Sequence, residues 1–201
     1  METSPLAQHA PNGAGRHRSP WKIAAWTAPL LLMLGMWVMT RSVQASGAGE
    51  GWSPGDYVFA SLILYGALGA YEVVSRMGRG NTLYRAAAGL GIGTAVLMVW
   101  SIAAVGLTDT DADAFYLVPL ALGFVGALVA RFRPRGMARA LFVTAAATGL
   151  VGVVALLAGA VAPHNSVLQI LGISGFFAVL FAGSAVLFNE AAEGRTTLGA
   201  A

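Results

Sequence analysis

Six long apolar stretches constrain the fold of this chain more than any other feature of its sequence. A helix needs about 20 mostly apolar residues to cross a bilayer, because lipid offers no partner for an unpaired backbone N–H or C=O group. The stretches that meet this requirement cover residues 23–40, 57–75, 86–107, 114–130, 140–162 and 167–188. The sequence therefore predicts an all-helical bundle with six transmembrane spans.

The composition agrees with a protein that is solvated mostly by lipid. Hydrophobic residues make up 57% of the chain and charged residues only 10%, whereas soluble domains contain about 45–50% and about 25%. The chain has no cysteine, which excludes disulfides and cysteine-ligated metals. We expect a basic tail over residues 1–22, a membrane domain over residues 23–190 and a short tail over residues 191–201.

The basic residues predict how the bundle is oriented. Cytoplasmic connections of membrane proteins are enriched in lysine and arginine. Eleven of the twelve basic residues fall in regions that six spans would place on one side: Arg16, Arg18, Lys22, Arg76, Arg79, Arg85, Arg131, Arg133, Arg135, Arg139 and Arg195. Only Arg41 falls on the other side, together with five acidic residues. Both termini are therefore expected in the cytoplasm.

The first apolar stretch has a second interpretation. A basic tail, an apolar run and the small-residue sequence Val43-Gln44-Ala45 also resemble a cleavable signal peptide. Cleavage would leave five spans and move the new N-terminus outside. A retained helix is favoured, because the run is longer than a usual signal core.

Glu72 is the one charged residue well inside a predicted span. It precedes Arg76 by four residues, so the two side chains share a helix face and can form an ion pair. Two other interpretations remain open. Glu72 could pair with Arg85 between helices, or it could handle protons or cations in a small transporter.

The most distinctive segment contains Arg131, Arg133, Arg135 and Arg139 within nine residues. We expect Pro134 and Gly136 to close a tight hairpin there, with Arg133 and Arg135 on the turn. Such a cluster sets membrane orientation, and it can also bind anionic lipid headgroups or a protein partner.

Other kinds of site find little support. None of the predicted spans contains a histidine, so a haem has no axial ligand of the usual kind. We predict no catalytic residues, no metal or other cofactor and no nucleic-acid partner. Asp109, Asp111 and Asp113 are expected to be solvated acids that cap the following helix.

Small residues predict close helix packing. Gly89 and Gly93 could form a dimer face, although packing within the chain is the simpler interpretation. The pairs Gly66/Gly69 and Gly123/Gly126 each precede an arginine-rich turn. These pairs hint at an internal repeat of two hairpins, which is a device that transporters use.

Several short motifs resemble a family of small uncharacterised bacterial inner-membrane proteins. The motifs are Tyr84-Arg85-Ala86-Ala87, Val99-Trp100, Ala104-Val105-Gly106, the segment from Ala130 to Leu141, Gly175-Phe176-Phe177-Ala178 and Gly183-Ser184-Ala185. The resemblance covers residues 52–191, and the arginine-rich segment is its most specific part. Ser101 and the stretch from Asp109 to Asp113 depart from the family's pattern. The resemblance implies a multi-pass protein of a bacterial inner membrane and implies no activity.

Three classes of function follow from these observations. A structural or accessory component of a membrane complex, in contact with lipid and other membrane subunits, fits the nearly uncharged spans best. A small transporter or channel that uses Glu72 is the alternative. Nothing in the sequence predicts an enzyme.

Overall fold

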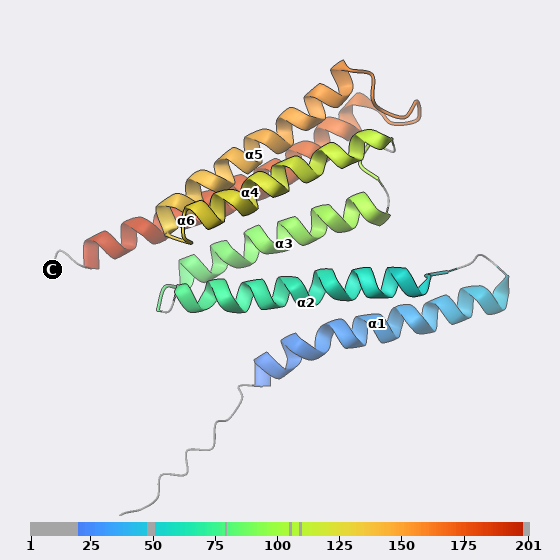
Figure 1. The fold of residues 1–201 in the computed structure, drawn as a ribbon, viewed down its shortest axis with the longest axis horizontal. Helices are drawn as coiled ribbons and strands as arrows, with labels where there is room; N and C mark the ends of the chain where they lie inside the picture. Colours follow the sequence, from blue (N-terminus) through green and yellow to red (C-terminus); the bar gives the residue numbers. More distant parts are fainter. Residues whose placement is uncertain (1–19, 48–50, 79, 105, 109, 199–201) are drawn as a thin grey trace, which may run out of the picture. The chain divides into compact units, whose positions relative to one another are not determined.

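The structure, a computed structural model, describes residues 20–47, 51–78, 80–104, 106–108 and 110–198. Arg16, Arg18, Arg79 and Asp109 lie outside the described residues. The described part is helical and contains no strand (Figure 1). Its elements are α1 (Pro20–Ser46), α2 (Pro54–Met77), α3 (Thr82–Ala104), the short 3-10 helix η1 (Asp111–Tyr116), α4 (Leu117–Val129), α5 (Pro134–Leu157) and α6 (Val167–Leu198).

Six helical segments are long and apolar enough to cross a membrane, the fourth of them combining η1 and α4. Large apolar side chains cover the outside of these segments, and Leu157, Leu168 and Val129 are about four-fifths exposed, at 83%, 81% and 79%. Contiguous apolar surface of this extent suits contact with lipid rather than water. The predicted fold class, an all-helical bundle of six spans, is confirmed.

The chain forms two compact units, residues 1–57 and residues 58–201. In the first unit a capping-box arrangement starts α2. The Asp56 carboxylate accepts hydrogen bonds from Ser53 N (2.7 Å) and Ser53 Oγ (2.9 Å), and Asp56 N donates to Ser53 Oγ (3.3 Å). Ser53 is therefore the cap, and the helix begins at Pro54 rather than at residue 57, because proline is favoured at the first helical position.

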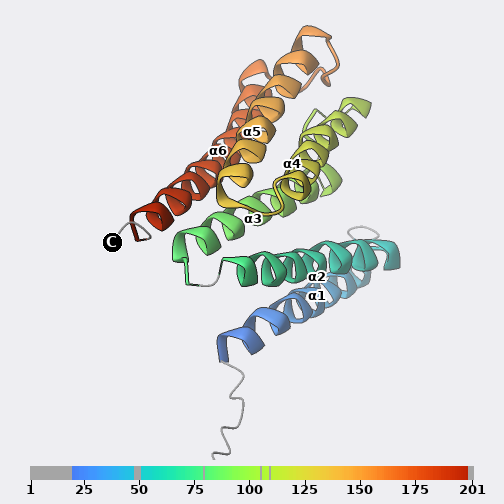
Figure 2. The same ribbon diagram turned by 60° about the vertical axis from the view of Figure 1, so that its left-hand side comes forward.

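In the second unit, α5 packs along α4 on one side and along α6 on the other, and α3 packs against α6 (Figure 2). The buried positions of α6 explain this arrangement. Ala185 is one of them. The others are Ile170, Ser174, Phe177, Phe181, Ser184, Phe188 and Ala191, and their spacing alternates between four and three residues. This spacing keeps one stripe of the helix turned toward its neighbours over its whole length.

Four glycines allow the helices of the second unit to approach closely. A methyl group added at Gly123 or Gly126 of α4 would clash with Thr144 or Ala140 of α5. A methyl group at Gly91 of α3 or Gly152 of α5 would clash with a serine of α6. These contacts agree with small residues as the means of close packing between membrane helices.

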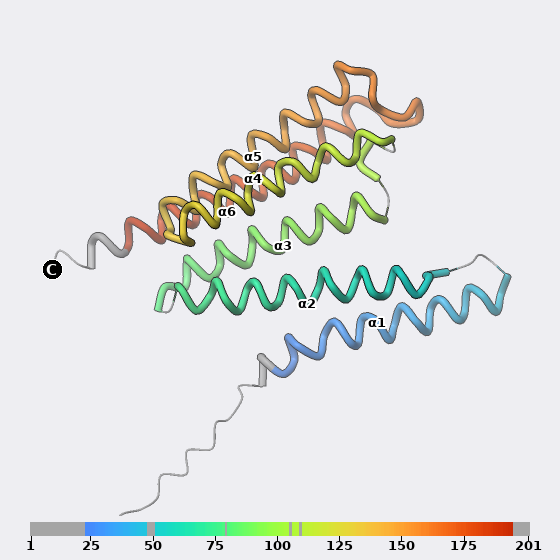
Figure 3. Tube along the Cα trace, viewed as in Figure 1, coloured from blue at the N-terminus to red at the C-terminus, as the bar shows by residue number. Residues whose placement is uncertain are grey.

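Gly66, Gly69, Gly89 and Gly93 do not bring helices into close contact within the described chain. Added methyl groups at Gly66, Gly69 and Gly93 would meet nothing within 4 Å among the described residues, and one at Gly89 would only touch the Tyr71 ring at 3.5 Å. The two hairpins of the suggested repeat therefore differ. The one formed by α4 and α5 is tightly closed, whereas α2 and α3 separate from each other away from their connecting turn (Figure 3).

Several helix ends differ from their predicted positions. Helix α3 ends at Ala104 and α5 ends at Leu157, several residues early, because Gly106 and Gly159 adopt positive φ angles of 76° and 64° that stop a helix. Helix α5 begins at Pro134 rather than near residue 140. Helix α6 continues past residue 190 to Leu198.

Candidate functional site

Glu72 and Arg76 form an ion pair within α2. The distance from Arg76 Nη2 to Glu72 Oε1 is 3.1 Å, and Arg76 Nε donates a second hydrogen bond to the same oxygen (3.3 Å). The Glu72 side chain is 23% exposed and that of Arg76 is 62% exposed. Glu72 lies five residues before Met77, where α2 ends, and its charge is balanced by that of Arg76.

Arg85 is not part of this arrangement. It lies in the first turns of α3 and is half-buried, but it forms no ion pair with another residue of the described chain. Of the three residues predicted to form an ion pair or ion site, the structure brings Glu72 and Arg76 together and leaves Arg85 outside.

The predicted hairpin around Pro134 and Gly136 is wrong, because both residues lie in the first turn of α5. The chain reverses earlier, over residues 130–133, which we call the arginine turn. Ala130 ends α4, Arg131 N donates to Leu128 O (3.0 Å) and Phe132 N donates to Ala127 O (3.2 Å). This pair of bonds is a Schellman motif.

The arginine turn adopts a backbone conformation that its residue types disfavour. Arg131 and Phe132 have φ angles of 49° and 57°, and a Schellman motif usually places glycine at the first of these positions. Each residue other than glycine costs about 1–2 kcal/mol in this region. Gly136 stands two positions into α5 instead, where an added methyl group would lie 2.6 Å from Ala130 Cβ.

Tyr84 of α3 forms a hydrogen bond with the backbone of this turn. Its hydroxyl donates to Phe132 O (2.8 Å), and its ring packs edge-on against Phe188 of α6. Tyr84 is 1% exposed. The hydroxyl was not identified from the sequence, because the contact joins residues 48 positions apart and has no local pattern.

All four arginines of the cluster are exposed. Arg131 follows α4, Arg133 immediately precedes α5 without a side-chain cap hydrogen bond, and Arg135 and Arg139 lie on the first two turns of α5. Within the described chain none of the four forms an ion pair. The structure therefore gathers four uncompensated positive charges around one helix connection.

A polar network at the other end of the second unit centres on Asp113. Its Oδ1 accepts hydrogen bonds from Leu107 N (2.9 Å), Thr108 N (2.6 Å) and Thr108 Oγ1 (2.8 Å). Asp113 therefore fixes the loop that precedes it, and the cap of η1 is Thr110, whose hydroxyl accepts from Ala112 N. The prediction that these acids are merely solvated caps is wrong for Asp113, while Asp111 is exposed.

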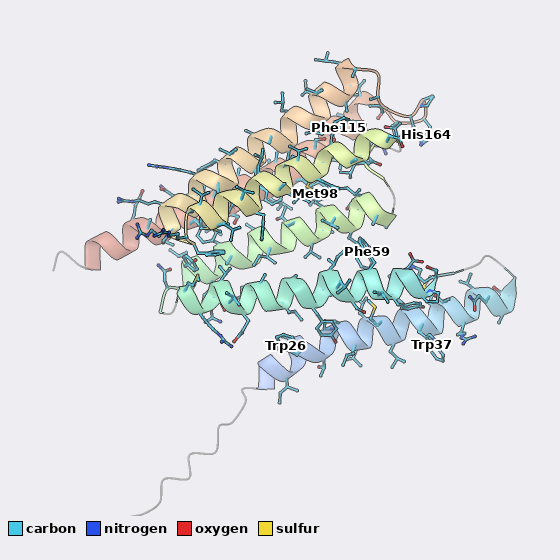
Figure 4. The ribbon with its side chains drawn as sticks, in the orientation of Figure 1. Trp26, Trp37, Phe59, Met98, Phe115 and His164 are labelled. Carbon is cyan, nitrogen blue, oxygen red and sulfur yellow. The ribbon has the colours of Figure 1, made fainter. Side chains whose placement is uncertain are left out.

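This network also joins two loops. Thr110 Oγ1 donates to Ala160 O (3.0 Å), Ala162 N donates to Thr108 O (3.0 Å), and Asn165 Nδ2 donates to the same oxygen (3.1 Å). His164 lies beside them in the loop between α5 and α6 (Figure 4). The loops that follow α3 and α5 are thus locked to each other.

Hydroxyl groups inside the second unit are satisfied by hydrogen bonds. Tyr116 and Ser174 are paired at 2.7 Å, and Ser184 Oγ donates to Ala87 O of α3 (2.7 Å). Thr94, Thr144 and Thr148 each donate to a carbonyl four residues earlier on their own helix. No buried side-chain nitrogen or oxygen of the described chain lacks a partner. The interior is a packed core in which the polar atoms are already engaged.

No group of three or more potential metal-ligating side chains occurs among the residues that the structure describes. Comparisons with protein-family models, with curated proteins and with solved structures give no match to this chain. The arginine turn and the Glu72–Arg76 pair are therefore interpreted from their geometry alone.

Proposed function

We propose that this protein is a non-enzymatic accessory component of a membrane protein complex in a bacterial inner membrane. The single observation that supports this role best is the interior of the second unit, where each buried hydroxyl named above already has a hydrogen-bond partner. A core of this kind resists rearrangement, because a broken buried hydrogen bond costs about 1–3 kcal/mol. It suits a scaffold better than a path for ions.

Helix α2 is the part of the second unit that fits a partner helix. It separates from α3, and the backbone at Gly66 and Gly69 has open space beside it. Backbones of membrane helices approach each other most closely at small residues. We propose that a transmembrane helix of another subunit packs on this part of α2.

The alternative, a transporter that uses Glu72, is less well supported. The Glu72 carboxylate is already paired with Arg76 at 3.1 Å, and both residues lie in the last two turns of α2. Proton or cation transfer across the membrane would need a group poised in the interior.

The accessory role predicts a specific result from site-directed photo-crosslinking in native membranes. A crosslinking amino acid at Leu62 of α2 should give adducts that add the mass of a second, defined membrane polypeptide. The matched control is Val179 of α6, which is equally exposed, at 70% for both residues, and should couple only to lipid. Electrophoresis and mass spectrometry of the adducts provide the measurement.

Two results would contradict the proposal. Identical lipid-only adducts at Leu62 and Val179 would mean that α2 has no protein partner. A proton or cation flux in vesicles that contain only this protein, if Glu72→Gln abolished it without unfolding the chain, would establish the transporter alternative.

A further inference from the structure

The arginine turn and the start of α5 carry positive charges that no residue of the described chain balances in an ion pair. Helix termini have partial charges, positive at the N-terminus and negative at the C-terminus. Arg131 therefore sits favourably after α4, but Arg133 and Arg135 lie at the positive end of α5, where the first turn contains no acidic residue. Both side chains are exposed and have no ion pair within the described chain. The local electrostatics thus favour an anion supplied from outside the protein.

The position of the turn relative to the membrane indicates which kind of anion would bind there. The turn joins α4 and α5, both of which belong to segments long and apolar enough to cross a membrane, so it lies at the level of the lipid headgroups. A phosphate there belongs to a phospholipid. Arginine is suited to this anion, because its planar guanidinium can donate two parallel hydrogen bonds to phosphate oxygens, which a lysine ammonium cannot.

The shape of the turn is maintained from α3. Two consecutive left-handed residues persist only where the surrounding structure holds them, and such conformations concentrate at binding sites. Here the Tyr84 hydroxyl donates to Phe132 O at 2.8 Å, and the partly buried Phe132 side chain packs against the core. This anchor fixes the directions in which Arg131 and Arg133 leave the backbone on either side of Phe132.

We propose that the arginine turn and the first turn of α5 bind the headgroup phosphate of an anionic phospholipid through Arg133 and Arg135, and that Tyr84 is a positioning residue for this site. The proposal rests on the membrane embedding of the helices and is independent of the accessory role. It therefore stands or falls separately from the crosslinking result at Leu62.

Native mass spectrometry of the full-length protein, titrated with phosphatidylglycerol or phosphatidylcholine, tests the site. The Arg133→Lys/Arg135→Lys variant keeps every charge and should keep its topology. It should bind phosphatidylglycerol about tenfold more weakly, which corresponds to about 1.4 kcal/mol. Arg76→Lys, a change of the same kind at an exposed arginine of α2, is the control and should bind like the unaltered protein.

A double-mutant cycle tests the part played by Tyr84. Tyr84→Phe should weaken phosphatidylglycerol binding about threefold, and this loss should disappear when Arg133 and Arg135 are already lysine, because coupled residues are not additive. Tyr116→Phe is the matched control: it also removes the hydroxyl of a buried tyrosine, one that bonds Ser174 at the other end. It should leave lipid binding unchanged.

Each other outcome overturns a defined part of the proposal. If Arg133→Lys/Arg135→Lys bound phosphatidylglycerol as tightly as the unaltered protein, the arginine cluster would serve only to set membrane orientation. Equal binding of phosphatidylcholine would show that the site does not select an anionic headgroup. Displacement of the lipid by millimolar inorganic phosphate would show that the site recognises free phosphate rather than a phospholipid. A loss in Tyr84→Phe that persists in the lysine background would show that Tyr84 acts on the fold and not on the site.

Discussion

Replacement of Gly152 by alanine should destabilise the protein by about 2 kcal/mol, within the range for overpacked cores. The added methyl group would overlap the Ser174 side chain of α6 and lie 3.4 Å from the Tyr116 hydroxyl. Helix α5 would have to move away from α6, and the hydrogen bond between Tyr116 and Ser174 would be strained. Thermal unfolding in detergent, followed by circular dichroism, should show a clearly lower midpoint.

Gly149 of the same helix provides the matched control. An added methyl group there meets nothing within 4 Å among the described residues. Gly149→Ala should therefore be neutral or stabilise the helix by up to about 1 kcal/mol, which is the intrinsic preference for alanine over glycine. Ser174→Gly in the Gly152→Ala background should restore part of the lost stability. Equal effects of Gly152→Ala and Gly149→Ala would contradict the packing of α5 on α6 described above.

Replacement of Asp113 by alanine should cost about 2–3 kcal/mol, because two backbone N–H groups and one hydroxyl lose their shared acceptor. The loop that contains Leu107 and Thr108 would lose its fixed shape, and Thr108 O is also the acceptor that holds Ala162 and Asn165. Thermal unfolding and hydrogen exchange of the two loops measure the effect. Both loops should lose protection together.

Two variants separate this role from the charge alone. Asp113→Asn keeps an oxygen acceptor at the same place and should be intermediate in stability. Asp111→Ala removes a carboxylate of the same loop that is exposed and should change stability by less than about 0.5 kcal/mol, as surface substitutions usually do. If Asp111→Ala proved as harmful as Asp113→Ala, the network around Asp113 could not be the cause.

The sequence predicted those features that depend on local composition. Each of the six apolar segments is close to the length of about 20 residues that a membrane-spanning helix needs, and their cores agree with the helices of the structure. Helix ends were less accurate. Pro134 was assigned to a turn, although proline is equally suited to the first position of a helix, and the chain does not reveal which use applies.

Contacts between distant segments were not predictable in this way. Tyr84 and Phe132 meet only because α3, α5 and α6 pack as they do, and the left-handed conformation of Arg131 is not indicated by its residue type. An acid before a helix usually caps it, so the position of Asp113 in the sequence predicts a cap and does not predict its hydrogen bonds to Leu107 and Thr108. Ser174 and Ser184 occur in register with the apolar residues of α6, and this spacing indicates that both side chains are buried.

Six helices are long and apolar enough to cross the membrane, and the distribution of basic residues predicts that the arginine turn lies in the cytoplasm. Because the chain has no cysteine, single-cysteine variants can be labelled with a membrane-impermeant maleimide in intact cells and after permeabilisation. Asp111→Cys, in the loop before η1, should react in intact cells. Thr82→Cys, at the start of α3 on the arginine side, should react only after permeabilisation. The reverse pattern, or labelling of both residues in intact cells, would contradict the account.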